Sequence, residues 1–181
     1  MNNNKPTILV VDDNPSNINI LLNLLKEYDT IPCTNGKTAI DIAKADDIDL
    51  ILLDIVMPEV NGFEVCKVLK ANPITKNIPI IFISGKSNVD DITKGFEIGG
   101  VDYITKPFNP LELQCRVSTH VKLASYQKNL ETKNNELALL NEKIKEFAKK
   151  EFENITNNQN SFMSSGNIDF SNLIDNMTLD K

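Results

Sequence analysis

The sequence is poor in histidine, the side chain that most often moves protons in enzymes, because His120 is the only one among 181 residues. One histidine therefore gives little support for a Ser-His-Asp hydrolase and cannot form a metal site with several histidine ligands or an HExxH motif. His120 itself is expected to be an ordinary polar residue near the end of a helix. Most histidine-dependent enzyme classes are disfavoured.

Cysteine is also scarce. Cys33, Cys66 and Cys115 are odd in number, lie far apart and form no CxxC pair, which excludes a disulfide framework and a zinc ribbon. We expect these cysteines to be reduced and mostly packed.

Positive charge is in deficit, with 19 Lys and Arg against 25 Asp and Glu and a formal net charge of −6. Such a field repels a polyanion, so direct binding to nucleic acid is not expected.

Long apolar runs are missing as well. No stretch approaches the roughly 20 uncharged apolar residues of a membrane helix, and the first residues, MNNNKPTILVVDDN, do not resemble a secretory signal. We therefore expect a cytoplasmic protein without a membrane partner.

From residue 7 to about residue 120, short branched apolar runs alternate with longer segments of helical period. Repeated βα units of this kind are typical of a parallel sheet, and Pro32 suits only an edge strand. The pattern predicts a three-layer αβα domain with right-handed crossovers. The predicted strands are Thr7–Val11, Thr30–Cys33, Leu50–Leu53, Ile78–Ile83 and Val101–Ile104.

Two of the intervening helices show clear apolar stripes, and two helix starts carry the same Asn-Pro signal, which combines a cap with a proline in the first turn. The stripes are Ile18, Leu21, Leu22 and Leu25, and Phe63, Val65, Cys66 and Leu69. The starts are Asn14-Pro15 and Asn109-Pro110.

Polar residues follow the predicted strands where each strand ends. Since ligands of open parallel sheets bind at the carboxyl ends of the strands, these side chains should meet in one crevice. Three carboxylates there repel one another unless a cation lies among them, and oxygen ligands with room for water suit Mg²⁺. The residues are Asp12, Asp13, Asp54, Ser84 and Lys106, the last followed by Pro107.

With these residues in place, the chain from about Pro6 to Leu123 resembles the receiver domain of bacterial two-component response regulators. The segments ILVVDDNPSN, LILLDIVMPEVNGFEVC, IPIIFISGK and GGVDYITKPFNPLEL carry the resemblance. It implies a flavodoxin-like (βα)₅ fold with strand order 2-1-3-4-5 over residues 1–124. It also implies a role in phosphorelay signalling, with a sensor histidine kinase or a phosphotransfer protein as partner.

The resemblance also implies roles for single residues. Asp54 is then the phosphoacceptor; Asp13, Asp54 and the backbone carbonyl of Val56 bind Mg²⁺ directly, and Asp12 holds it through water. Ser84 and Lys106 contact the phosphoryl oxygens. A cis bond precedes Pro107.

Gly62 is expected to relieve a tight turn after the acceptor loop. In the switching mechanism that the family suggests, Ser84 moves inward and Tyr103 fills the vacated space. The output surface would be the fourth helix, near Asn88 to Ile98, with strand five and the fifth helix.

Residues 125–153 are free of glycine and proline and continue the fifth helix. A heptad register makes seven of eight seam positions apolar or aromatic, which favours a homodimeric coiled coil; the alternative is a helix packed back on its own domain. The seam is Leu123, Tyr126, Leu130, Lys133, Leu137, Leu140, Ile144 and Phe147.

Residues 154–181 are rich in asparagine and serine and are expected to be mostly disordered. Only Phe170, Leu173, Ile174 and Met177 suggest a short amphipathic turn. No output domain is recognisable, so the chain is either a fragment of a longer protein or an adaptor that works through its helix and tail.

Three functions compete. The first is a phosphorylatable switch that is not an enzyme in its own right. The second is a haloacid-dehalogenase-like hydrolase, which the valine at position 56, in place of the second aspartate of a DxD motif, disfavours. The third is a non-phosphorylated scaffold, which the complete set of Asp12, Asp13, Asp54, Ser84 and Lys106 disfavours.

Overall fold

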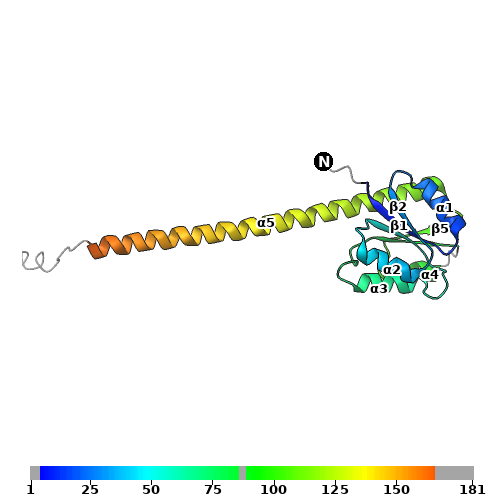
Figure 1. The fold of residues 1–181 in the computed structure, drawn as a ribbon, viewed down its shortest axis with the longest axis horizontal. Coiled ribbons are helices and arrows are strands. Elements are labelled where there is room, and N and C mark those ends of the chain that lie inside the picture. The colour runs from blue at the N-terminus through cyan, green and yellow to red at the C-terminus, as the bar shows by residue number, and fades with distance from the viewer. Residues whose placement is uncertain (1–4, 86–88, 166–181) are drawn as a thin grey trace, which may run out of the picture. The chain divides into compact units, whose positions relative to one another are not determined.

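The computed structural model describes residues 5–85 and 89–165 and contains one parallel sheet with the order β2-β1-β3-β4-β5 (Figure 1). This order and the flavodoxin-like (βα)₅ fold are those expected from the sequence. The strands are β1 Thr7–Val11, β2 Asp29–Cys33, β3 Leu50–Asp54, β4 Ile80–Ser84 and β5 Asp102–Thr105. The helices are α1 Pro15–Leu24, α2 Gly36–Ala45, α3 Gly62–Ala71, α4 Val89–Glu97 and α5 Pro110–Ser165.

The sheet forms because its central strands are apolar on both faces, as a parallel sheet between two helical layers requires. Every residue of β3 and β4 is buried, whereas β2, which contains the exposed Pro32, lies at an edge. On one face the core contains side chains of α2 and α3, and on the other it contains those of α1 and the start of α5. Figure 1 shows these helices on opposite sides of the sheet.

Asparagine side chains fix the helix starts, which sets where each strand-to-helix loop ends. Asn14 accepts a hydrogen bond from the Ser16 amide, and Asn109 accepts from the amides of Leu111 and Glu112. Both predicted Asn-Pro caps are confirmed. Each such cap stabilises its helix by about 1 kcal/mol.

The chain divides into two units, the first ending at Asn129 and the second starting at Leu130. Helix α5 ends at Ser165, so it continues beyond Glu153, where the sequence predicted the disordered tail to begin. The predicted turn residues Phe170, Leu173, Ile174 and Met177 lie outside the described residues. Within the described part, no helix combines the length and apolarity needed to cross a membrane.

Two cysteines are packed as expected. Burial raises the thiol pKa of Cys33, and that of Cys66 to about 11, so both are poor nucleophiles. Cys115, in contrast, is exposed on α5.

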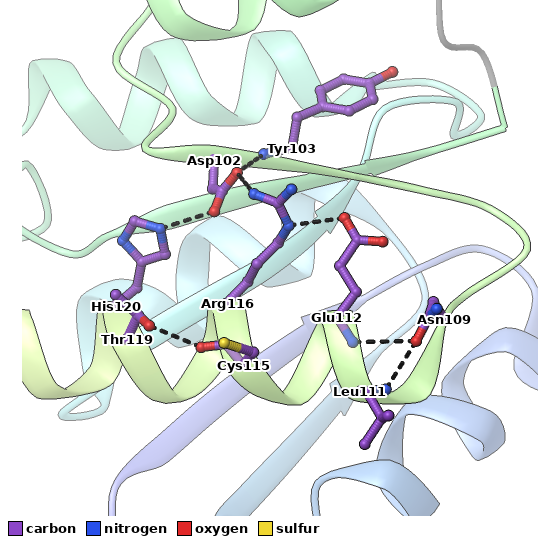
Figure 2. A network of polar contacts seen from close by, with 9 residues as sticks. All are labelled: Asp102, Tyr103, Asn109, Leu111, Glu112, Cys115, Arg116, Thr119 and His120. Atoms are coloured by element: carbon purple, nitrogen blue, oxygen red, sulfur yellow. Dashed lines mark hydrogen bonds and ion pairs between the residues drawn. The ribbon is translucent and has the colours of Figure 1, made fainter.

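Strand β5 is attached to α5 by a polar network centred on the carboxylate of Asp102 (Figure 2). Arg116 Nη1 lies 2.7 Å from Asp102 Oδ1 and His120 Nε2 lies 3.0 Å from Oδ2. Glu112, one turn before Arg116, accepts from Arg116 Nε at 2.9 Å. His120 therefore lies within a helix and holds it to the sheet, which the sequence analysis did not anticipate.

Burial would raise the pKa of Asp102, but hydrogen bonds from the Tyr103 amide, Arg116 and His120 outweigh it and hold the pKa of this carboxyl below its usual value. A carboxyl with a lowered folded-state pKa stabilises the fold above its unfolded pKa. That stability is lost as the pH falls through the folded value.

We therefore expect Asp102→Asn to lower the free energy of unfolding at pH 7 by about 1 kcal/mol, since Arg116 loses a charged acceptor that is partly solvated. The difference from the wild type should begin to shrink below about pH 4, the ordinary carboxyl pKa, and should disappear only once the pH has fallen through the lower pKa of the folded state. Urea denaturation at several pH values measures both effects.

Glu136→Gln is the matched control, because its ion pair with Lys133 is exposed on both sides and should contribute little at any pH. An Asp102→Asn deficit that persists unchanged at low pH would show that the carboxylate charge is not what holds α5 to β5.

Candidate functional site

The strand order brings the polar residues at the carboxyl ends of the strands together. Asp12 follows β1 directly, and Asp54 is the last residue of β3, the strand beside it. Both carboxylates are buried, at 0% and 4% exposure, while Asp13 is exposed. Two buried acids on neighbouring strands need a positive partner, because an unpaired buried charge is very costly.

Lys106, which follows β5, supplies that partner. Its Nζ lies 2.7 Å from Asp12 Oδ2 and 2.9 Å from Asp54 Oδ2, so one ammonium bridges two carboxylates. The Lys106 amide donates to the carbonyl of Ser84 at 2.9 Å, and the bond from Lys106 to Pro107 is cis, as the resemblance implied. The lysine is therefore fixed at its backbone as well as at its charged end.

The bridge governs the electrostatics of Asp54. Burial raises the pKa of Asp54 above its usual value, and the hydrogen bond and charge of Lys106 oppose that rise only in part. For Lys106, burial acts to lower the pKa, but the hydrogen bonds to Asp12 and Asp54 outweigh it and raise the pKa. The site thus holds the charged ammonium of Lys106 next to the carboxyl of Asp54, whose ionised form is destabilised by burial.

Asp12, Asp13 and Asp54 also form a group able to hold a metal ion, since one carboxylate oxygen of each lies within 4.8 Å of the others. Three carboxylates at this separation match the oxygen chemistry of Mg²⁺. Val56, whose backbone carbonyl is the fourth predicted ligand, follows Asp54 closely, and its amide lies 3.4 Å from Asp54 Oδ1.

Gly62 is needed for space rather than for a turn. A Cβ there would lie 2.2 Å from the carbonyl oxygen of Asp54 and 2.9 Å from the Cα of Ile55. The residue with positive φ in this loop is Glu59, at 63°. A Cβ at Gly62 would therefore be strained, as expected, and the cause is that the first residue of α3 lies against the backbone that carries Asp54.

The two predicted switch residues are both buried. Ser84 is 1% exposed at the end of β4, and Tyr103 is 8% exposed on β5, in the apolar cluster that also contains Phe63 and Phe82. The predicted output helix corresponds to α4, which begins at Val89. Asn88, the first residue of the predicted range, lies outside the described residues.

Sequence reasoning missed one side chain of the site. Asn17 Nδ2, in the first turn of α1, lies 2.9 Å from Asp12 Oδ1 and 3.1 Å from Asp12 Oδ2. The sequence did contain a signal for this contact. Asn17 is a polar residue directly before Ile18, the first buried residue of α1, and it lies in the helix turn that follows the end of β1.

Comparison with known proteins gives a consistent answer. The family described as "Response regulator receiver domain" matches residues 8–118. A probable cyclic di-GMP phosphodiesterase of Vibrio cholerae is 49% identical over 117 residues, which are 64% of this chain and 26% of that protein. The alkaline phosphatase synthesis transcriptional regulatory protein PhoP of Bacillus subtilis is 36% identical over 133 residues, 72% of this chain and 55% of that protein. This chain thus spans from about a quarter to about half of these curated relatives.

Solved structures agree. The receiver domain of a signal transduction histidine kinase from Syntrophus aciditrophicus is similar with a TM-score of 0.60 at 33% identity, covering 65% of this chain and 90% of that one. The chemotaxis protein CheY4 of Vibrio cholerae is similar with a TM-score of 0.61 at 26% identity, covering 64% of this chain and 98% of that one.

The bridge makes a prediction about stability. Lys106→Ala leaves two buried carboxylates without their cation, so without divalent ions it should lower the free energy of unfolding by about 2 to 4 kcal/mol. Mg²⁺ should then raise the melting temperature of this variant more than that of the wild type, because the ion replaces the missing charge. Thermal melts with EDTA and with Mg²⁺ measure the difference.

Lys128→Ala is the control, because it removes an exposed ion pair with Asp47, which precedes β3, whereas Asp54 ends that strand. It should change neither the stability nor the response to Mg²⁺ appreciably. If Lys106→Ala is as stable as the wild type in EDTA, the lysine does not compensate the buried carboxylates.

Proposed function

Because the chain belongs to the response regulator receiver domain family, we propose that it is a phosphorylation-driven switch whose acceptor is Asp54. Receiver domains of two-component response regulators are phosphorylated on an aspartate, and the match over residues 8–118 includes every residue of the site. The observation that carries the assignment is the contact between Lys106 and Asp54. Of the clustered carboxylates, Asp54 is the one that ends the central strand β3 with the lysine directly against it.

The carboxylate chemistry fits this role. An oxygen of Asp54 forms a bond to phosphorus, and the bond from phosphorus to the donor breaks, so that the donor leaves with the electron pair. Lys106 stabilises the charge that develops on the phosphoryl oxygens, and the Ser84 hydroxyl contacts one of these oxygens. For this transfer the Lys106 ammonium must turn from Asp54 towards the phosphoryl group.

Mg²⁺ is the proposed cofactor, held by Asp13, Asp54 and the Val56 carbonyl, with Asp12 acting through water. When bound, it supplies positive charge against which a carboxylate and a phosphoryl dianion can approach each other. Support comes from the donor set, which consists only of oxygens, and from the separation of the carboxylates within 4.8 Å.

Neither alternative function is favoured by the geometry. A hydrolase of the haloacid-dehalogenase type needs an acid two residues after its nucleophile, and Val56 is at that position. A scaffold without chemistry has no use for two buried acids bridged by a lysine. We therefore propose that the chain itself is a phosphoacceptor and not an enzyme with an independent substrate.

The proposed switch couples the site to β5. Ser84 moves towards the phosphoryl group and the Tyr103 ring follows into the space, which alters the surface of α4, β5 and α5. The structure offers a connection, since the Lys106 amide is bonded to the Ser84 carbonyl and Tyr103 lies three residues before Lys106.

The proposed partners are a sensor histidine kinase or a phosphotransfer protein, and a second copy of the chain through α5, in the cytoplasm and without direct binding to nucleic acid. The heptad residues support the dimer because they are exposed: Leu137, Leu140, Ile144 and Phe147 are each more than half exposed. The proposed division is a receiver, residues 1–124, a coiled-coil segment, residues 125–153, and a final segment, residues 154–181, into which α5 continues as far as Ser165.

Incubation with Mg²⁺ and acetyl phosphate should add one phosphoryl group that is labile in both acid and base, as an acyl phosphate is. Chelation should abolish the reaction, because without the cation the carboxylates repel the incoming dianion. Intact-mass measurement detects the product.

Asp54→Asn should prevent this labelling, while Asp102→Asn, a matched substitution of a partly buried aspartate outside the site, should leave it intact. Phosphoryl incorporation that persists in Asp54→Asn rules out Asp54 as the acceptor.

Replacing Leu137 and Leu140 by Asp should yield a folded monomer that is still phosphorylated, because two charges in the seam oppose pairing. Lys133 at a seam position already weakens the pairing, so we expect a wild-type dimer of modest affinity that phosphorylation strengthens. Light scattering at several concentrations measures the mass, and a wild-type protein that stays monomeric at high micromolar concentration, phosphorylated or not, contradicts the coiled coil. Asn135→Asp and Ala138→Asp, which lie at positions f and b on the outer face of the helix, serve as controls.

A further inference from the structure

Asp12 is the most enclosed acid of the site, with 0% exposure, and both of its oxygens are fully used. Oδ1 accepts from the Asn14 amide at 2.9 Å and from Asn17 Nδ2 at 2.9 Å. Oδ2 accepts from Asn17 Nδ2 at 3.1 Å and from Lys106 Nζ at 2.7 Å. Each oxygen of this carboxylate therefore has two donors.

Asn17 differs from the other donors because it alone contacts both oxygens. A carboxylate only accepts hydrogen bonds, so the amide nitrogen of Asn17, and not its oxygen, faces Asp12. A donor that spans both oxygens opposes rotation of the carboxylate group about its own axis. The Asn14 amide and Lys106 each hold one oxygen and leave that rotation possible.

Asn17 is not needed to start its helix. Asn14 already caps α1 by accepting from the Ser16 amide, and Pro15 occupies the first helical position. The side chain of Asn17 thus points from the first turn towards the site, and the contact it makes there is with Asp12.

We infer that Asn17 is a positioning residue for divalent-cation binding: it holds the Asp12 carboxylate in one orientation when Lys106 turns away from it. The inference rests on the proposed function, in which Lys106 leaves the carboxylates for the phosphoryl group. At that moment Asp12 loses one of its donors, and Asn17 remains to satisfy both oxygens of a buried charge. Loss of such a supporting contact typically weakens metal binding by about 10- to 100-fold.

The test is a calorimetric titration with Mg²⁺ alone. Asn17→Ala should weaken binding by about 10-fold, and phosphorylation by acetyl phosphate should then need a correspondingly higher Mg²⁺ concentration. Asn17→Asp keeps the shape but replaces the donor by a fourth carboxylate, so it should bind Mg²⁺ more tightly and be less stable in EDTA. Asn19→Ala, the same change at an exposed position of α1, should match the wild type.

Weaker Mg²⁺ binding by Asn17→Ala, with a melting temperature in EDTA close to that of the wild type, supports the inference, because a purely structural role would lower both together; the tighter binding of Asn17→Asp reports its added charge. Wild-type affinity in Asn17→Ala, or an equal weakening in the control Asn19→Ala, overturns it while leaving the proposed function standing. A wild-type protein that binds no Mg²⁺ overturns the proposed function and this inference with it.

Discussion

The ammonium of Lys106 between the carboxylates of Asp12 and Asp54 is the interaction on which the rest of the site depends. Burying two acids on adjacent strands is tolerable only with a cation between them, and the lysine is that cation in the structure. An incoming metal ion and the lysine then compete for the same oxygens. In the proposed function the site exchanges one positive charge for another, and a chemical event at Asp54 thereby moves a side chain attached to β5.

Strand β5 connects this exchange with the long helix. At its end, Lys106 reaches the acids, and at its start Asp102 holds Arg116 and His120 of α5. Tyr103, the next residue after Asp102, packs into the core on the opposite face of the sheet from α5. One four-residue strand thus links the acceptor, the proposed switch residue and the helix that carries the exposed apolar seam.

Much of this arrangement follows from sequence. The apolar runs of β3 and β4 and the Asn-Pro caps mark the elements clearly, and the parallel topology brings Asp12, Asp54 and Lys106 to one edge. Contacts that depend on side-chain direction could not be predicted from the sequence. Examples are those of Asn17 with Asp12 and of His120 with Asp102. The sequence pattern of a helix does not distinguish a polar residue that faces water from one that faces a buried acid. The end of α5 was also misplaced, since the asparagine-rich composition after Glu153 suggested disorder although the helix continues to Ser165.

The close approach of Gly62 to the backbone of Asp54 limits insertions and deletions in the loop between these two residues. The Gly62 amide donates to the Ile55 carbonyl at 3.0 Å, so the residues between them form a loop whose two ends are joined directly after Asp54. An exposed side chain on that loop, such as that of Val56, can vary without disturbing this hydrogen bond. An added or deleted residue would displace either Asp54 from the end of β3 or α3 from the face of the sheet. The length of this segment is therefore more strictly constrained than its amino-acid composition.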